Sequence, residues 1–168
     1  DFINKRENSL SISGWNRLIK NCNQSIPNST LNEIEPDILE EIQHSFNFCT
    51  KYWPTTLPKG FIHADMFPDN VFFNDNKISG VIDFYFSCTD ILTYDLAIAV
   101  NAWCFEENLI FSNKKFDALI KGYSSVRNLS KEELFYLPLL SQAAAMRFLL
   151  TRLYDWVHTP KNAIVVPK

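Results

Sequence analysis

The sequence predicts a mainly helical α+β domain in which a few short β-strands interrupt the helices midway along the chain. Between Gly60 and Ile82, short apolar runs alternate with turn residues, as in small strands that include a tight hairpin. After Asp90, apolar residues recur at the spacing of one helix face to near the end of the chain. We therefore expect a single domain over residues 1–168, whose strands carry a central loop.

Two helices are expected before the strands. The first lies in the polar opening segment, before a loop at Pro27 to Thr30, and has its apolar residues at Trp15, Leu18 and Ile19. The second begins at Pro36 and Asp37 and extends to Trp53-Pro54. Its apolar residues share one helix face: Ile38, Ile42, Phe46 and Cys49.

Further helices are expected after the strands. Two of them have apolar stripes, formed by Leu96, Val100 and Trp103 and by Phe116, Leu119, Ile120 and Tyr123. Ser130 and Glu133 form a capping box, in which each side chain accepts a hydrogen bond from the other's backbone N–H, so a helix begins there. We expect Pro138 to kink or restart this helix, and the stretch Leu139–Val157 to be buried nearly all round.

The composition is that of a globular chain, with 46% apolar and 21% charged residues. The net charge is -3 and the 16 basic residues are interspersed with 19 acidic ones, so neither a nucleic acid nor a membrane surface is an expected partner. No apolar run approaches the roughly 18 to 20 residues of a membrane span, and no signal peptide is evident. The four cysteines are widely spaced, which favours a reduced, cytoplasmic protein.

The chain has only four glycines, and no two of them lie close together. A glycine-rich loop that cradles phosphates therefore cannot be formed from these residues. If the chemistry uses ATP, we expect the loop that cradles its phosphates to lie elsewhere.

The densest cluster of chemically informative residues runs from His63 to Asn70, and Asp83 follows the expected hairpin. The spacing is the H-x-D-x-x-x-x-N pattern of kinase catalytic loops, with a second aspartate in a D-F-x context. Asp65 could accept the proton of a substrate hydroxyl, while Asn70 and Asp83 offer oxygen ligands to Mg²⁺. His63 is expected to hold the loop by hydrogen bonds.

Each residue also has a structural interpretation. Asp65 or Asp83 alone is more often a turn or cap residue, and Asp69 is interpreted as a loop residue. Asn70 at its fixed spacing from Asp65, with strands on both sides, favours the catalytic loop. A glycoside hydrolase that pairs Asp65 with Asp83 is an alternative, but it gives Asn70 no role.

The segment from Gly60 to Trp103 resembles the aminoglycoside phosphotransferase and choline kinase superfamily, and more closely its homoserine kinase branch. The similar stretches are FIHADMFPDNVFF, GVIDFYFSCTD, YDLAIAVNAW and AAAMRFLLTRLYDW, which cover most of Trp53 to Lys168. This resemblance implies the carboxyl-terminal, large lobe of a protein-kinase-like fold, with the amino-terminal nucleotide-binding lobe absent from this chain. We therefore expect the isolated chain to be inactive, because phosphoryl transfer depends almost entirely on positioning and electrostatics. It also implies ATP, Mg²⁺ and transfer of the γ-phosphate to the hydroxyl of L-homoserine, a step of threonine biosynthesis.

Transferred onto this sequence, the resemblance makes Asp65 the catalytic base and makes Asn70 and Asp83 the metal ligands. Asp90 and Asp95 match a D-x-x-x-x-D stretch, for which loop-anchoring and capping roles are expected. The sequence departs from many relatives at Gln142, where an arginine would be expected.

Homoserine is a zwitterion, so its pocket should offer a cation to the carboxylate and an acceptor to the ammonium group. Arg147, Arg152 and Asp155 could serve, although interactions within their own helix are the more common role for such neighbours. A related kinase for an aminoglycoside, choline or a sugar would share the catalytic loop. A non-catalytic binding module is a further alternative, which the intact loop disfavours.

Overall fold

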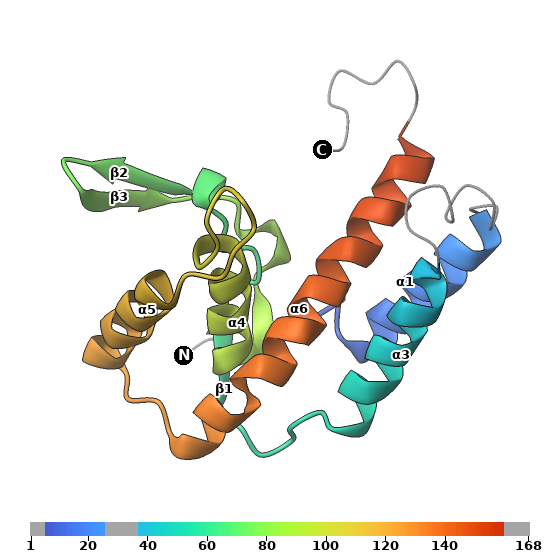
Figure 1. Ribbon diagram of the computed structural model, residues 1–168, viewed down its shortest axis with the longest axis horizontal. Helices are drawn as coiled ribbons and strands as arrows, with labels where there is room; N and C mark the ends of the chain where they lie inside the picture. Colours follow the sequence, from blue (N-terminus) through green and yellow to red (C-terminus); the bar gives the residue numbers. More distant parts are fainter. Residues whose placement is uncertain (1–5, 26–36, 160–168) are drawn as a thin grey trace. The chain divides into compact units, whose positions relative to one another are not determined.

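The computed structural model describes residues 6–25 and 37–159, which divide by their contacts into two compact units (Figure 1). One unit contains the residues up to Asn8 and Pro54–Ala144, and we call it the mixed unit because it holds all the named strands. The other contains Ser9–Trp53 and the chain from Ala145 onwards, and we call it the helical unit. The expected single domain over residues 1–168 stays a prediction.

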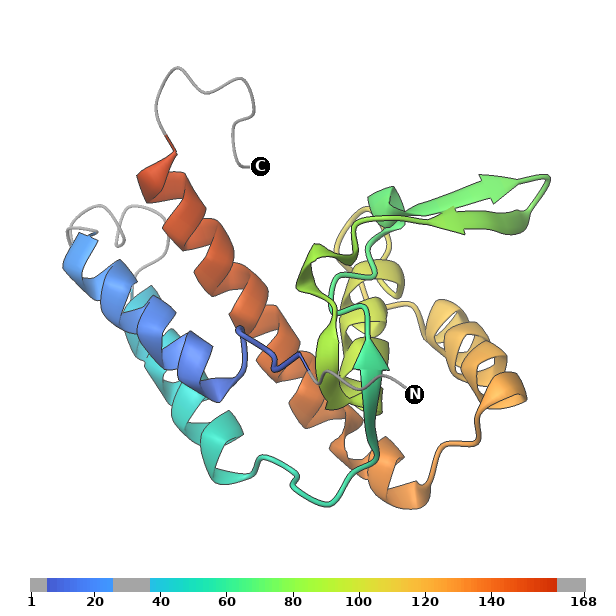
Figure 2. The ribbon, with the colours of Figure 1, turned by 180° about the vertical axis from the view of Figure 1, so that it is seen from behind.

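The strands of the mixed unit form two antiparallel pairs. Strand β1 (Lys59–Ile62) pairs with β4 (Cys88–Ile91), and β2 (Val71–Asn74) forms a hairpin with β3 (Lys77–Val81). The hairpin turns through Asp75 and Asn76, both at positive φ, and a bulge interrupts its register between Phe72 and Phe73. Two views show that it extends beyond the rest of the mixed unit (Figures 1 and 2).

The expected strands and hairpin are confirmed, but β4 was missed. Its sequence, CTDI, lacks the alternation that marks a half-buried strand. Cys88 and Ile91 are nevertheless buried, and the strand pairs with β1 from Ile62 opposite Cys88 to Lys59 opposite Ile91. It forms because a partner far away in the sequence completes its hydrogen bonds.

Helix α4 (Leu92–Trp103) is the core of the mixed unit, and seven of its residues are buried. Helix α5 (Asn113–Val126) has no fully buried residue and covers one side of the unit. A short 3₁₀ turn at Pro68–Asn70 lies between β1 and β2, and a second one at Phe84–Phe86 lies between β3 and β4. These turns position the polar residues described below.

The helical unit contains α1 (Ile12–Ser25), α3 (Ile38–Lys51) and the second part of α6 (Lys131–His158). Its centre includes Trp15, whose ring packs edge-on against Trp53 at 5.3 Å between centroids. Gly14 allows a close approach, because a Cβ there would lie 2.2 Å from the Ser9 carbonyl oxygen. Both expected helices are confirmed; the loop at Pro27 to Thr30 and Pro36 fall outside the described residues.

Helix α6 differs from expectation in two ways. It continues through Pro138 without a restart, and parts of its later surface are exposed at Gln142, Leu149 and Trp156, so burial all round was wrong. Within the described residues, α6 is also the one helix long and apolar enough to cross a membrane, which corrects the expectation that no such segment exists. Core helices of soluble proteins meet the same test of length and composition.

The beginning of α6 is fixed by the capping box. Ser130 Oγ accepts a hydrogen bond from the Glu133 N–H at 3.1 Å, and Glu133 Oε2 accepts one from the Ser130 N–H at 2.9 Å. The other carboxylate oxygen of Glu133 accepts bonds from the Thr93 hydroxyl at 2.7 Å and the Arg127 guanidinium at 2.6 Å. One carboxylate, only 2% exposed, therefore joins α4, the end of α5 and the start of α6.

We predict that Glu133→Ala lowers the free energy of unfolding by on the order of 2 to 4 kcal/mol, because it removes the cap and leaves the buried Thr93 hydroxyl and Arg127 without their acceptor. Urea unfolding measures this loss. The control is Glu132→Ala, one residue earlier, where the lost bond from Thr56 is exposed and should cost only about 0.5 kcal/mol. Equal losses in the two variants would contradict the prediction.

The same contacts make the contribution of Glu133 to folding stability depend on pH. Burial alone would raise the pKa of Glu133, but the bonds from Ser130, Thr93 and Arg127 outweigh it and lower the pKa. The stabilisation is therefore complete above the unfolded pKa of about 4.3 and is lost as pH falls through the lower folded value. The stability difference from Glu133→Ala should shrink in that acidic range.

Candidate active site

The predicted catalytic loop connects β1 to β2, and Asp83 lies two residues after the end of β3, so the hairpin brings Asp83 back to the end of the loop. The Ile82 N–H donates to the Asn70 carbonyl at 3.0 Å, which continues the hairpin ladder to the residue before Asp83. Asp65 is half-buried, Asn70 is buried and Asp83 is exposed. The three predicted residues thus share one end of the hairpin.

Asp95 holds the start of the loop. Its carboxylate accepts the backbone N–H of His63 at 3.0 Å and that of Ala64 at 2.8 Å, one bond on each oxygen. Ala64 has a φ of 64°, a left-handed conformation that costs a residue with a Cβ roughly 1 to 2 kcal/mol. The two bonds from the first turn of α4 hold the chain in this conformation, directly before Asp65.

Asn70 ties the end of the loop to Asp65. Its side-chain Nδ2 donates to the Asp65 carbonyl oxygen at 2.8 Å and to Asp65 Oδ2 at 3.2 Å. Both partners are acceptors only, so the nitrogen of the amide must face them. The Asn70 Oδ1 atom is left outside these bonds.

His63 fixes both neighbours of Asp83. Its Nε2 lies 2.9 Å from the Ile82 carbonyl oxygen, and because a carbonyl only accepts, Nε2 carries the hydrogen. The imidazole also packs edge-on against Phe84, at 4.6 Å between ring centroids. Asp83 lies between these two anchored residues, with φ 63° and ψ 58°, a conformation that aspartate tolerates better than most residues.

Trp103, at the end of α4, supports the loop from another side. Its indole N–H donates to the Met66 carbonyl oxygen at 2.8 Å, one residue after Asp65. No pattern in the sequence indicates this bond, because 37 residues separate its partners and an apolar helix stripe equally well explains a tryptophan there. The loop is therefore held by a carboxylate at its start and an indole in its middle, both from α4.

Asp90 has a different position. In β4 it lies opposite Gly60, and its carboxylate accepts hydrogen bonds from the Asn8 side chain at 2.7 Å and from the Ile91 N–H at 2.8 Å. Asp90 therefore ties the segment before α1 to the β1–β4 pair. Asp69, interpreted as a loop residue, is exposed in the 3₁₀ turn before β2.

The arrangement fits Mg²⁺ on the chemistry of its donors. Among the described residues, no group of three His, Cys, Asp or Glu side chains gathers as a metal site. Magnesium usually keeps several waters and takes one or two protein carboxylates, so the Asp83 carboxylate and Asn70 Oδ1 are a sufficient set. The orientation of the Asn70 amide, fixed by its bonds to Asp65, leaves the atom that a metal would use available.

The residues predicted for the substrate lie in the helical unit. Arg147 is buried, with its guanidinium carbon 4.2 Å from the ring centroid of Phe148. Arg152 and Asp155 are exposed on the same helix, as is Gln142 on the part of α6 in the mixed unit.

Comparison with known proteins identifies the family. Residues 14–129, more than half of the chain, match the phosphotransferase enzyme family. The chain belongs to this family. Relatives of this chain include a homoserine kinase of Sinorhizobium medicae, 49% identical over 99% of this chain and 50% of the relative, and one of Paramagnetospirillum magneticum, 49% identical over 100% and 52%. The chain spans about half the length of the curated relatives it matches.

Solved structures confirm the mainly helical α+β fold class expected for this chain. An aminoglycoside-3'-phosphotransferase of type VIII superposes with a TM-score of 0.58 and 18% identity, over 80% of this chain and 50% of that one. An ethanolamine kinase of Plasmodium vivax superposes with a TM-score of 0.59 and 19% identity, over 95% and 47%. At these identities the likeness concerns the fold, and it covers half of each structure.

We predict that Asp95→Ala leaves the His63 and Ala64 amides without their acceptor and lowers the free energy of unfolding by about 1 to 3 kcal/mol. Hydrogen exchange at those two amides should accelerate, which a general loss of helix stability would not produce selectively. Asp117→Ala on the exposed surface of α5 is the control and should stay within about 0.5 kcal/mol. Unchanged exchange at both amides would show that Asp95 does not hold the loop.

Proposed function

We propose that the whole protein is an ATP-dependent homoserine kinase, which transfers the γ-phosphate of ATP to the side-chain hydroxyl of L-homoserine and yields O-phospho-L-homoserine, a step of threonine biosynthesis in the cytoplasm. The observation that supports this acceptor is the 49% identity to a homoserine kinase over 99% of the chain. The catalytic loop supports the reaction type. Its residues match the roles that phosphoryl transfer requires.

In this proposal Asp65 accepts the proton of the attacking hydroxyl. The two bonds from Asn70 Nδ2 hold the backbone and carboxylate of Asp65, so the base is positioned before substrate arrives. Asn70 Oδ1 and the Asp83 carboxylate would hold Mg²⁺, which supplies positive charge to the phosphate oxygens. His63 and Asp95 position these groups without contacting substrate.

The whole protein should also contain an amino-terminal nucleotide-binding lobe. The relatives are about twice as long as this chain, and the four separated glycines cannot form a phosphate-cradling loop. We therefore propose that this chain provides the base and metal ligands, and that the other lobe holds the nucleotide. The isolated chain should not turn over.

A kinase for an aminoglycoside, choline or a sugar would use the same loop, so the acceptor decides between these functions. The test is a coupled assay of ADP release by the whole protein with a panel of hydroxyl acceptors, and the isolated chain serves as the negative control. We expect L-homoserine to give the highest kcat/KM. A higher kcat/KM for another acceptor would show that homoserine is not the substrate. Absence of transfer to every acceptor would favour a non-catalytic binding module.

For substrate recognition we propose Arg152 and Asp155, which are exposed on α6, as partners of the homoserine carboxylate and ammonium groups. Buried Arg147 would instead support this helix from within. We predict that Arg152→Ala in the whole protein raises KM for homoserine by about tenfold or more, the effect of losing a charge-assisted bond of about 1.5 to 3 kcal/mol, while KM for ATP stays constant. Steady-state kinetics in both substrates measures this, and an unchanged KM for homoserine would remove Arg152 from the site.

Asp83→Asn should weaken the binding of the metal–nucleotide complex, because a neutral oxygen replaces an anionic ligand of Mg²⁺. The Mg²⁺ concentration for half-maximal activity of the whole protein should rise, and the melting temperature should hardly change because the side chain is exposed. Asp75→Asn, at the other end of the hairpin, is the matched control. A normal rate and an unchanged Mg²⁺ dependence would exclude Asp83 as a ligand.

Asp65→Asn conserves shape but removes the group that accepts the hydroxyl proton. In the whole protein we expect kcat to fall by on the order of 10² to 10⁴, because that is the usual contribution of a general base. Nucleotide affinity should persist, since Asn70 and Asp83 remain. A variant that melts early but catalyses normally when folded would show that Asp65 is only a loop anchor.

A further inference from the structure

One peptide group of the predicted catalytic loop, between Met66 and Phe67, is held from both sides. Its N–H donates to the Asp65 carbonyl oxygen at 2.8 Å, and its carbonyl accepts the indole N–H of Trp103 at 2.8 Å. A peptide group is planar, so its N–H and its carbonyl cannot turn independently. The bond from Trp103 therefore also sets the direction of the N–H that bonds to Asp65.

This peptide group belongs to a chain of hydrogen bonds that ends at Asp65. The bond from the Phe67 N–H closes a γ-turn, in which a single residue separates the donor from the acceptor. The Asp65 carbonyl oxygen also accepts Asn70 Nδ2 at 2.8 Å. Hydrogen bonds in such a series polarise and strengthen one another. Loss of the bond from Trp103 should therefore loosen the backbone after Asp65, while Asp95 still holds the backbone before it.

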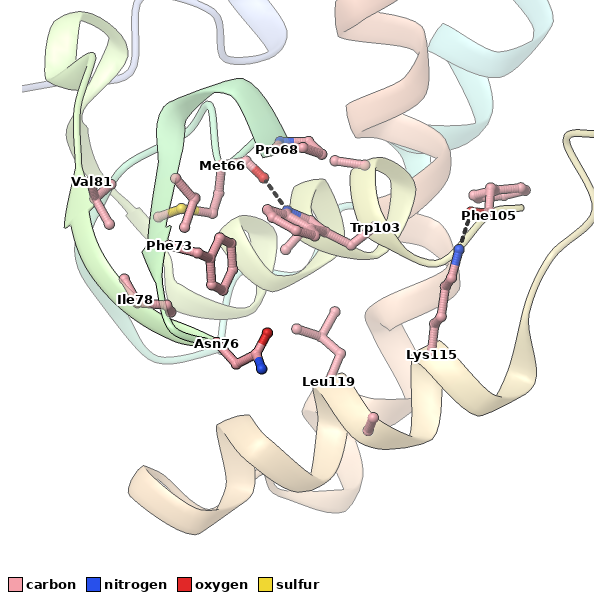
Figure 3. A pocket seen from close by; sticks show the side chains of 14 residues that line it. Met66, Pro68, Phe73, Asn76, Ile78, Val81, Trp103, Phe105, Lys115 and Leu119 are labelled. Atoms are coloured by element: carbon pink, nitrogen blue, oxygen red, sulfur yellow. Dashed lines mark hydrogen bonds between the residues drawn. The ribbon is translucent and has the colours of Figure 1, made fainter. Parts of the chain in front are cut away.

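Trp103 is oriented by contacts with two different elements. It is the last residue of α4, and its ring packs edge-on against Phe73 of β2, at 6.3 Å between centroids. Figure 3 shows the indole N–H directed at the Met66 carbonyl, with the Phe73 ring beside the indole. The indole is half-buried and lines a groove of about 1140 Å³, so packing does not enclose it on that side. Its orientation therefore depends on the contact with Phe73 and on the bond to Met66.

Filling space is the alternative role for an indole in an apolar helix stripe. Trp15 has such a role, because it is fully buried and its Nε1 has no hydrogen-bond partner among the described residues. Trp103 differs in both respects, since it is half-buried and its N–H bonds to the loop. Phenylalanine fills space without offering an N–H, so the two roles predict different outcomes for a substitution.

We propose that Trp103 is a positioning residue for phosphoryl transfer. Its indole N–H sets the rotation of the Met66–Phe67 peptide group and thereby the direction in which Asp65 faces the acceptor hydroxyl. Phe73 acts through Trp103 by orienting the indole, and neither aromatic residue contacts substrate. The inference rests on the proposed kinase reaction but does not depend on which hydroxyl compound is the acceptor.

Trp103→Phe in the whole protein tests this role, because it keeps an aromatic ring at the end of α4 and removes the donor. We expect kcat to fall by about tenfold, roughly the effect of one hydrogen bond, while KM for ATP and for the acceptor stays constant. Trp15→Phe is the matched control, which should lower the melting temperature and leave kcat of the folded enzyme unchanged. A normal kcat in Trp103→Phe, or equal losses of kcat in the two variants, would overturn the proposal.

A second replacement guards against a general loss of folding. In 3-benzothienylalanine a sulfur atom takes the place of the indole N–H, so the two-ring shape is retained and the donor is lost. At position 103 it should lower kcat by the same factor of about ten. Full activity with this side chain would show that the shape of Trp103, and not its N–H, matters.

A double-mutant cycle tests the role of Phe73. Phe73→Leu alone should lower kcat by about threefold, and the double variant should be no slower than Trp103→Phe, because Phe73 acts through the indole. A combined loss of about thirtyfold would mean that the two effects are independent. That result, or a higher Mg²⁺ requirement in Phe73→Leu, would overturn the link between Phe73 and Trp103.

Hydrogen exchange gives a readout that needs no turnover. The Phe67 amide should exchange faster in Trp103→Phe, while the His63 and Ala64 amides, held by Asp95, keep their protection. Unchanged exchange at Phe67 would overturn the proposal even if kcat falls. Absence of transfer by the unsubstituted protein would remove the proposed reaction and this role together, whereas normal turnover by Trp103→Phe would remove this role alone.

Discussion

The candidate site depends first on the carboxylate of Asp95. It accepts two successive backbone N–H groups, those of His63 and Ala64, at the point where Ala64 takes up a left-handed conformation. Charged acceptors form the stronger class of hydrogen bond, and two such bonds offset the cost of this conformation. After β1 the chain therefore adopts a locally unfavourable backbone conformation at Ala64, and this conformation sets the direction of the rest of the loop.

The remaining contacts extend this constraint to the middle of the loop and to the base of the hairpin. His63 bonds to the Ile82 carbonyl and packs on Phe84, so the same residue whose N–H is held by Asp95 also fixes the neighbours of Asp83. Trp103 holds Met66 from the other end of α4. Because α4 is the most buried helix of the mixed unit, the loop is attached to a rigid element rather than to the exposed hairpin.

The sequence predicted the parts of this arrangement that are local. The spacing of Asp65 and Asn70, the hairpin turn at Asn74 to Asn76 and the capping box of Glu133 all depend on neighbours in the chain, and the structure has the corresponding elements. The short strand β4 and the Trp103 bond depend on partners more than 25 residues away, since Ile62 pairs with Cys88 and Trp103 with Met66. Such pairings leave no periodic signal in a single sequence.

Glu133 shows how a local prediction can be correct and still incomplete. The capping box predicted its bonds to Ser130, but the same carboxylate also accepts from Thr93, 40 residues away. The sequence therefore indicated a helix start and not a junction of three helices. Of the two outcomes expected at Pro138, a kink or a restart, the restart does not occur, because α6 continues through this residue as one helix.

Asn70 has the most demanding position in the site, because its two ends serve different partners. The Nδ2 end holds Asp65 through its carbonyl and carboxylate oxygens, and the Oδ1 end is left for a metal. Rotating the amide by half a turn would place an acceptor against two acceptors, so the bonds to Asp65 also set which way Oδ1 faces. In the proposed reaction, the position of the base and the ligation of the metal would therefore be coupled through one planar group. Aspartate at this position would lose the donor, and a shorter side chain would lose both contacts, so the arrangement depends on a carboxamide five residues after Asp65.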